Sequence, residues 1–292
     1  MPIRSFLFAP ANHPRRVEKS VTVGADAVIF DLEDAVAISE KPGARAKAVA
    51  ALQQPRRCLA YIRVNAMETP FCFGDLLAVV QPGLDGIVLP KTETAAGLLA
   101  IDWIVAQLER ERNLPVGGID IMPIIETAKG VTHIDEIMTA GSRVRRVAFG
   151  AGDYSLDLGV TWSRLEKECA HARDVIVTAS RAHGLEPPLD SVFPRLEDPE
   201  GLNLSAQAAV ELGYQGKMCI HPDQIGPVNA CFTPSEEEIA FSRKVVEGFA
   251  QAEKEGSAAF RIDGKFVDYP ILYRAQRVLK TMEDIQSRQG AS

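Results

Sequence analysis

The sequence predicts a (β/α)₈ barrel followed by an appended helix–hairpin–helix segment. Three observations favour this fold class. Eight short apolar runs alternate with segments of helical length over the first 220 residues, no glycine-rich phosphate turn follows the first run, and the pattern changes after residue 222. A chain of 292 residues has the length of one such barrel with a small appendage.

The apolar runs have the character of buried parallel strands. They are short, nearly continuous and rich in β-branched or aromatic residues, as in a parallel sheet covered on both faces by helices. We expect strands at Ile3–Phe8, Ala27–Leu32, Leu59–Val64, Gly86–Leu89, Ile119–Ile125 and Arg146–Gly150, with weaker ones at Leu189–Phe193 and Gly216–Ile220.

The segments between these runs predict the helices that cover the sheet. Eight strand–helix units favour a closed barrel over an open doubly wound sheet. In addition, the first run is followed by PANHP and not by GxGxxG. We expect helices at about 14–24, 40–53, 92–113, 130–142, 162–183 and 199–213, with a shorter one at 70–82.

The remaining residues predict a separate C-terminal element. Ser235 and Glu238 form a capping box ahead of an amphipathic run. Two short alternating runs then meet at Asp263-Gly264, a strong hairpin signal, and Pro270 starts a last helix. We therefore expect a barrel over 1–222, and an extension over 223–292 that acts as a lid or packs on a neighbouring subunit.

Composition limits the class of protein. A net charge of −7 and a pI near 5.4 argue against a nucleic-acid surface. The five scattered cysteines form no CxxC pair and are typical of reduced thiols. The N-terminal apolar run is too short for a signal peptide, and no uncharged stretch of 18 residues occurs. We expect a soluble, cytoplasmic protein with no membrane partner.

Polar side chains arrive where the predicted strands end. In an α/β barrel these positions face one shared site. Parallel strands also commonly end in polar turns, but a run of acids with Arg and Lys at one mouth favours an active site. The strand-end residues are Pro10, Asp31, Glu33, Asp34, Arg63, Asn65, Pro90, Lys91, Glu126, Asp153, Ser191 and His221.

Glu126 and Asp153 end consecutive strands, so their carboxylates are expected to lie close together. Two unpaired carboxylates repel each other unless a cation lies between them. Mg²⁺ prefers carboxylate, water and substrate oxygens, and no His/Cys set suggests Zn²⁺. The alternative is that both acids cap the helices that follow them; the metal site is the favoured interpretation.

Arg63 ends an apolar strand with Asn65 on the same face. A buried arginine needs a partner, and a substrate carboxylate or a developing oxyanion fits. An internal salt bridge to Glu33 or Asp34 fits nearly as well.

Lys91 and His221 each have two interpretations. Lys91 could form a Schiff base, as in metal-free aldolases, or pair with an acid or phosphate. The nearby acid pair favours the second. His221 could be a base, although a lone histidine at a strand end more often packs or donates one structural hydrogen bond.

Eight segments span almost the whole chain, in the order SFLFAPANHP, GADAVIFDLEDAV, YIRVN, GIVLPKTE, PIIETAKG, AFGAGDYSLDLG, GKMCIHPDQI and GKFVDYPILYRAQRVL. Together they resemble the citrate lyase β-subunit-like family of the HpcH/HpaI aldolase superfamily. This family includes citryl-CoA, malyl-CoA and citramalyl-CoA lyases.

The resemblance implies roles for matching residues. Glu126 and Asp153 would bind Mg²⁺, with Mn²⁺ as an alternative ion. Arg63 would bind the keto acid and stabilise a thioester enolate, and Asp268 would be the acid/base carboxylate that the C-terminal lid delivers into a neighbouring subunit's site. Glu33 and Asp34 would hold Arg63 and the metal's waters. Positions near CoA or substrate would be Phe8, Lys19, Lys91, Gly152, Ile220 and His221.

The resemblance also implies the reaction and the partners. We expect cleavage or formation of a 3-hydroxyacyl-CoA, with acetyl-CoA and a 2-keto acid as the other side of the reaction, in a homotrimer or homohexamer. A β-subunit in a larger complex would instead take its acyl group from a carrier protein. The alternatives are a class II aldolase acting on CoA-free substrates and a non-catalytic homologue that binds CoA or a keto acid.

One departure concerns the CoA site. Relatives often read P-G-x-R-P after the first strand, with the arginine on a CoA phosphate. Here Ala11 replaces the glycine and His13 the arginine. Arg15 or Arg16 are the candidate replacements for that contact.

Overall fold

The chain forms two compact units. The computed structural model describes residues 2–141 and 143–290. The first unit is Ile3–Ala230, and the second begins at Cys231. The first unit thus extends beyond the expected boundary at residue 222. It includes most of α10 (Ile225–Cys231), where Val228 is fully buried and Asn229 hydrogen-bonds both Ser5 and the Gly24 carbonyl.

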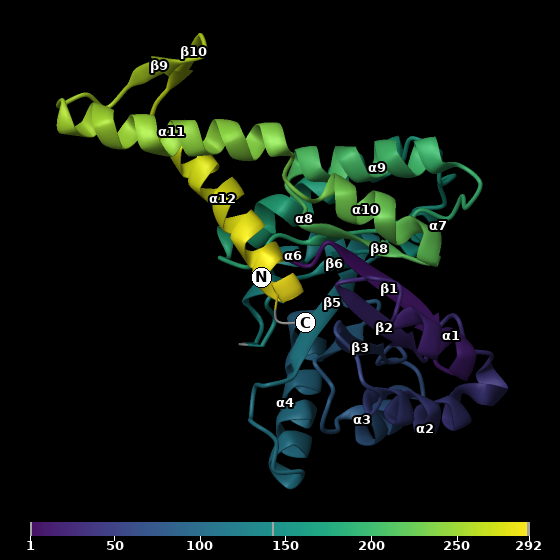
Figure 1. Ribbon diagram of the computed structural model, residues 1–292. Helices are drawn as coiled ribbons and strands as arrows, with labels where there is room; N and C mark the ends of the chain where they lie inside the picture. The colour runs from purple at the N-terminus through teal and green to yellow at the C-terminus, as the bar shows by residue number, and fades with distance from the viewer. Residues whose placement is uncertain (1, 142, 291–292) are drawn as a thin grey trace. The chain divides into compact units, whose positions relative to one another are not determined.

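The first unit is a closed barrel of eight parallel strands, which confirms the predicted fold class (Figure 1). Neighbouring strands in the chain pair in order. The barrel closes where β1 pairs with β8, with Leu7 opposite Cys219. The strands are β1 (Ser5–Pro10), β2 (Ala27–Asp31), β3 (Leu59–Arg63), β4 (Gly86–Leu89), β5 (Asp120–Ile125), β6 (Ala148–Phe149), β7 (Leu189–Asp190) and β8 (Gly216–Cys219).

Alternate strand residues fill the barrel interior. Phe6, Ile29, Tyr61, Val88 and Met122 belong to one buried cluster, in which Phe6 and Tyr61 meet edge to face. Because side chains alternate along a strand, the intervening residues face the surrounding helices. This arrangement explains why the strands are apolar on both faces and why polar groups are left to the strand ends.

Helices follow nearly every strand. They are α1 (Pro14–Ser20), α2 (Lys41–Leu52), α3 (Cys72–Val79), α4 (Ala95–Glu111), α5 (Ala128–Thr132), α6 (Ile134–Thr139), α7 (Ala151–Asp157), α8 (Ala170–Ala182) and α9 (Pro199–Leu212), with 3₁₀ turns η1 (Ile38–Glu40), η2 (Lys167–Cys169) and η3 (Pro222–Gln224).

Two predicted helices were wrong in extent. The single helix expected at 130–142 is split into α5 and α6 at His133, whose Nδ1 donates to the Glu93 carbonyl. The helix expected at 162–183 starts only near residue 167. Glu166 adopts a left-handed conformation (φ 52°), and its carboxylate accepts from Trp162 and Arg173. Side-chain hydrogen bonds therefore override helical propensity in both segments.

The second unit has the expected order of elements. Helix α11 (Glu236–Lys254) begins with the capping box of Ser235 and Glu238, and the hairpin of β9 (Phe260–Ile262) and β10 (Lys265–Val267) turns at Asp263-Gly264, both at positive φ. Helix α12 (Tyr269–Gly290) follows. The small core of this second unit centres on Phe249 and Val267.

Within the described part of the chain, no helix is both long and apolar enough to cross a membrane.

Candidate active site

The carboxyl ends of β2 and β3 are joined by a buried ion pair between Asp31 and Arg63. Nε and Nη2 of Arg63 each donate to one carboxylate oxygen at 2.7 Å. The amides of Glu33 and Ala35 donate to the same carboxylate. Burial raises the pKa of Asp31, but the guanidinium and the two amides outweigh it, so this pKa is lowered. Arg63 is therefore fixed in position by Asp31, a strand-end acid that the sequence did not pair with it.

Glu33 extends this ion pair toward the barrel axis. One oxygen lies 2.9 Å from Nη1 of Arg63, and the other accepts from Nζ of Lys91 at 2.8 Å. Asp34 is more distant from Arg63, at 3.7 Å, and largely exposed. The structure thus contains the salt bridge left open in the sequence analysis. Burial raises the pKa of Glu33 despite both cations.

Glu126 is the most deeply buried acid of the mouth that has no ion-pair partner. Only 3% of the residue is exposed, and its Oε1 accepts from the Lys91 backbone amide at 2.7 Å. Burial, reinforced by the charges of Asp153 and Glu33, raises the pKa of Glu126 to about 8. Gly150 lies against this side chain: a Cβ there would stand 2.6 Å from Cβ of Glu126.

Asp153 lies in the first turn of α7, directly after β6. The start of this helix is tied to β7, because the Ala151 amide donates to Oγ of Ser191 at 2.8 Å. Asp153 Oδ1 lies 3.6 Å from Nζ of Lys91. Glu126 and Asp153 are thus joined through one residue, Lys91, as expected for acids that end neighbouring strands.

A buried network that the sequence analysis missed supports the β2 and β3 ends. Nζ of Lys41 donates to the carbonyls of Leu32 and Glu33 and to Asn65 at 2.6–3.1 Å. Asn65 donates in turn to Asp75. The spacing of Lys41 in α2 gives no sign of this role, because the contact depends on the tertiary arrangement of three loops.

The described residues suit a divalent cation that takes only part of its ligands from protein. No group of three or more His, Cys, Asp or Glu side chains is arranged to hold a metal among them. Two carboxylates completed by water and substrate oxygens are what Mg²⁺ commonly uses. Oε2 of Glu33 is buried and forms an ion pair with Nη1 of Arg63 but accepts no hydrogen bond, which leaves an acceptor position for a metal-bound water.

The net charge of the mouth also favours a divalent cation. Five carboxyl groups meet two cations at this mouth: Asp31, Glu33, Asp34, Glu126 and Asp153 against Arg63 and Lys91. With all groups ionised the cluster carries 2 − 5 = −3. A divalent cation reduces this excess and allows Glu126 to remain ionised near neutral pH.

The other expected site residues lie at different places relative to this cluster. Phe8 contacts it directly, since the Arg63 guanidinium lies 4.7 Å from its ring centroid. Gly152 lies in α7 beside Trp162. Ile220 and His221 follow β8, where the histidine Nδ1 accepts from the Asp223 amide. Lys19 and His13 are exposed on and before α1.

Asp268 belongs to the second unit, immediately before α12. Its carbonyl accepts from the Leu272 amide, and a carboxylate oxygen accepts from the Ile271 amide at 3.4 Å. The side chain is partly exposed. A role in catalysis stays a prediction.

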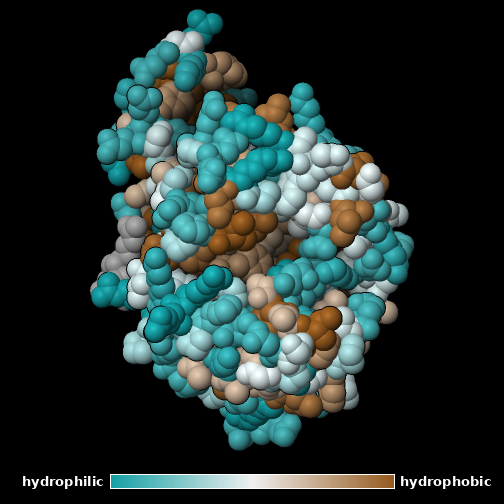
Figure 2. All heavy atoms as spheres, turned by 90° about the vertical axis from the view of Figure 1, so that its right-hand side faces the viewer, coloured by the Kyte–Doolittle hydropathy of each residue, from teal (hydrophilic) through white to brown (hydrophobic). Residues whose placement is uncertain are grey.

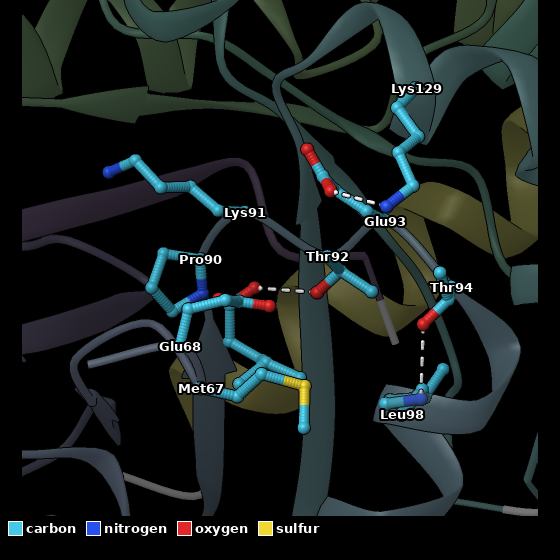
Figure 3. A pocket seen from close by; sticks show the side chains of 11 residues that line it. Met67, Glu68, Pro90, Lys91, Thr92, Glu93, Thr94, Leu98 and Lys129 are labelled. Carbon is cyan, nitrogen blue, oxygen red and sulfur yellow. Dashed lines mark hydrogen bonds and ion pairs between the residues drawn. The ribbon is translucent and has the colours of Figure 1, made fainter. Parts of the chain in front are cut away.

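A pocket lies beside the end of β4, lined by residues that include Met67, Thr94, Leu98 and Lys129 (Figure 3). Lys129 pairs with Glu93 there, whereas the Lys91 side chain extends away from the other labelled side chains (Figure 3). Lys91 also lines this pocket, which therefore borders the acid cluster at that residue.

Apolar side chains are exposed on several of the segments that follow the strands: Ile38 in η1, Leu156 in α7 and Ile220 after β8. Ile38, Leu156 and Ile220 are 74%, 78% and 40% exposed. Figure 2 shows apolar residues as separate patches among hydrophilic ones on one face of the molecule. Such patches commonly mark binding surfaces.

A parallel barrel with acids, arginine and lysine gathered at the carboxyl ends of its strands is the arrangement of an α/β-barrel enzyme. A family model described as HpcH/HpaI aldolase/citrate lyase matches residues 4–222. The chain belongs to this family, which confirms the resemblance, and it is a carbon–carbon lyase.

Relatives cover nearly the whole chain. Citrate lyase subunit beta of Leuconostoc mesenteroides subsp. cremoris is 38% identical over 95% of this chain and 92% of its own. The L-malyl-CoA/beta-methylmalyl-CoA lyase of Cereibacter sphaeroides is 32% identical over 98% and 96%.

Solved structures agree. CitE from Mycobacterium tuberculosis, in complex with magnesium, acetoacetate and coenzyme A, has a TM-score of 0.78 at 31% identity and covers 97% of this chain and 98% of its own. A citrate lyase from Burkholderia xenovorans LB400 has a TM-score of 0.86 at 18% identity, covering 98% and 93%, and shows the fold alone.

Proposed function

We propose that this chain uses a divalent cation, held by Glu126 and Asp153, to cleave or form the carbon–carbon bond of a 3-hydroxyacyl-CoA. Citramalyl-CoA, malyl-CoA and citryl-CoA are the candidate substrates, and acetyl-CoA and a 2-keto acid are the products. The observation that carries the proposal is the excess of carboxylates over cations at the mouth, with a fixed arginine beside them. The magnesium and coenzyme A bound by the CitE relative support it.

The cation and Arg63 would act on opposite fragments of the substrate. When bound, Mg²⁺ or Mn²⁺ supplies Lewis-acid polarisation of the hydroxyl and carboxylate oxygens. Arg63 would stabilise the thioester enolate oxygen, which receives the electron pair of the breaking bond. Because Asp31 holds Arg63 through two hydrogen bonds, the guanidinium is preorganised for this charge.

Glu33 and Asp34 would then serve the site without binding the metal directly. Glu33 already joins Arg63 to Lys91, and its Oε2, which pairs with Arg63 but accepts no hydrogen bond, is available to a metal-bound water. Phe8 packs on the guanidinium and shields it from water, which strengthens its electrostatic effect. Lys91, Gly152, Ile220 and His221 follow strand ends of the same mouth and are proposed to contact substrate or CoA, and Lys19 of α1 to contact CoA.

Asp268 is proposed to protonate the enolate carbon in cleavage, or to remove that proton in condensation. We propose that the extension acts on the site of a neighbouring subunit in a homotrimer or homohexamer. Mixing inactive Arg63→Ala protein with inactive Asp268→Asn protein tests this. Recovered activity in the mixture supports sharing between subunits, whereas no recovery after subunit exchange contradicts it.

A CoA-free class II aldolase is the second candidate. The observation that favours it is His13, exposed where relatives often carry a phosphate-binding arginine. Turnover with a thioester against the corresponding free acid, each with Mg²⁺, separates the two. Cleavage of the thioester alone supports the lyase, whereas equal cleavage of the free acid supports the aldolase. A carrier-bound thioester as the only substrate would indicate a partner protein.

A further inference from the structure

Lys91 has an unusual backbone conformation. Its φ is 47°, in the left-handed region that side chains other than Asn and Asp seldom adopt. This conformation directs its amide toward Oε1 of Glu126 at 2.7 Å. A strained backbone persists when surrounding contacts hold it, and such strain concentrates at functional sites.

The side chain of the same residue reaches two further acids. Nζ lies 2.8 Å from Oε1 of Glu33 and 3.6 Å from Oδ1 of Asp153. Lys91 therefore contacts acids from the ends of β2, β5 and β6. Among the residues that the structure describes, it is the cation that forms an ion pair with a proposed metal ligand.

The second cation of the mouth, Arg63, already has acidic partners. Arg63 makes two hydrogen bonds to Asp31 and an ion pair with Glu33. Arg63 offsets part of the repulsion among Glu126, Asp153 and Glu33, and the Lys91 ammonium, which pairs with both Glu33 and Asp153, adds a second positive charge. This charge lies where the charge of a bound divalent cation is also needed.

We propose that Lys91 is a built-in counter-cation of the metal site. Its ammonium (to Glu33 and Asp153) and its backbone amide (to Glu126) hold the three acids together before the metal arrives, and the ammonium charge then repels the metal and lowers the affinity. This inference rests on the proposed metal site and concerns the strength of metal binding. It implies that the ion exchanges with solution and is not held permanently.

The test is Mg²⁺ binding to the metal-stripped, full-length protein by titration calorimetry. We expect Lys91→Met to bind Mg²⁺ roughly tenfold or more tightly than wild type, because a unit charge close to the ion is removed. Lys91→Arg keeps the charge and should stay near wild type. Lys129→Met is the matched control: it removes a neighbouring lysine paired with Glu93, and should change nothing.

Lys91→Gly is a second neutral variant, which accommodates the left-handed backbone and guards against misfolding of the first. It should also bind Mg²⁺ more tightly. A residue with only a structural role predicts the opposite sign, since loosened acids bind metal less well. Unchanged or weaker binding in both neutral variants would overturn the inference while leaving the metal site intact. Failure of wild type itself to bind Mg²⁺ would overturn both.

Discussion

Gly150→Ala should disable the site through a single methyl group. Gly150 directly follows β6, and Glu126 directly follows β5. A Cβ at position 150 would lie 2.6 Å from Cβ of Glu126 and 3.0 Å from Cγ2 of Ile124, and would also overlap Oε2 of Glu126. Carbon atoms in contact ordinarily stand about 3.5–4.0 Å apart. Glu126 must therefore move by roughly 1 Å, and its Cβ allows no rotation that avoids the clash.

The magnitude follows from burial. Glu126 is 3% exposed, and overpacking of such a buried site costs about 1–3 kcal/mol of folding stability. A displacement of about 1 Å in a catalytic group costs roughly 10²-fold in rate. We expect Gly150→Ala to fold, to lose stability in that range and to lose at least that factor in kcat.

The assay is steady-state cleavage of the best thioester substrate, together with urea unfolding. Gly43→Ala is the matched control, because a Cβ at this exposed position in α2 meets nothing within 4 Å. It should keep full activity and gain a few tenths to about 1 kcal/mol of stability. Wild-type kcat in Gly150→Ala would refute the placement of Glu126 in the reaction.

The remaining predictions concern three buried groups. Arg63→Lys keeps the charge but loses the two-pronged contact with Asp31, so kcat should fall about 10²-fold with the fold intact; unchanged kcat would contradict this. The pKa of Glu126 rises from its usual 4.5 to about 8, so the metal-free fold binds more protons than the unfolded chain in that window. The Tm in EDTA should therefore fall as pH rises through it, and less so in Glu126→Gln. Lys41→Met removes a donor that three oxygens share and leaves Oδ1 of Asn65 without one, so the urea-derived stability should fall by about 1–3 kcal/mol; no loss would argue against the network.

Much of the fold could be predicted because local patterns and tertiary structure agree. The eight apolar runs are strands, and the capping box at Ser235 and the turn at Asp263-Gly264 are present. The helices expected at 130–142 and 162–183 were wrong in extent, because where each helix begins and ends depends on contacts with residues distant in the sequence. The loop before α8 is held by Glu166, whose carboxylate accepts hydrogen bonds from Arg173 and Ser205. No local sequence pattern encodes these contacts.

The candidate site was also predictable in its positions but not in its contacts. Strand-end position was enough to bring Glu33, Arg63, Lys91, Glu126 and Asp153 to one mouth. The Arg63–Glu33 salt bridge was one of two open interpretations, because which strand-end residues touch one another depends on side-chain direction.

Asp31, Lys41 and Gly150 went unassigned for the same reason. Their importance lies in a bidentate contact, a three-way hydrogen bond and a close approach, respectively. A glycine after a strand is one signal that could have found the last of these.

The central claim is a metal-dependent carbon–carbon lyase whose cation is held by Glu126 and Asp153. The most direct measurement is acetyl-CoA release from citramalyl-CoA, malyl-CoA and citryl-CoA by wild type and by Glu126→Gln, with Mg²⁺ and with EDTA. The account predicts release from at least one thioester by wild type, abolished by EDTA and reduced by roughly 10²-fold or more in the variant. Release that survives EDTA, or a fully active Glu126→Gln, would contradict it.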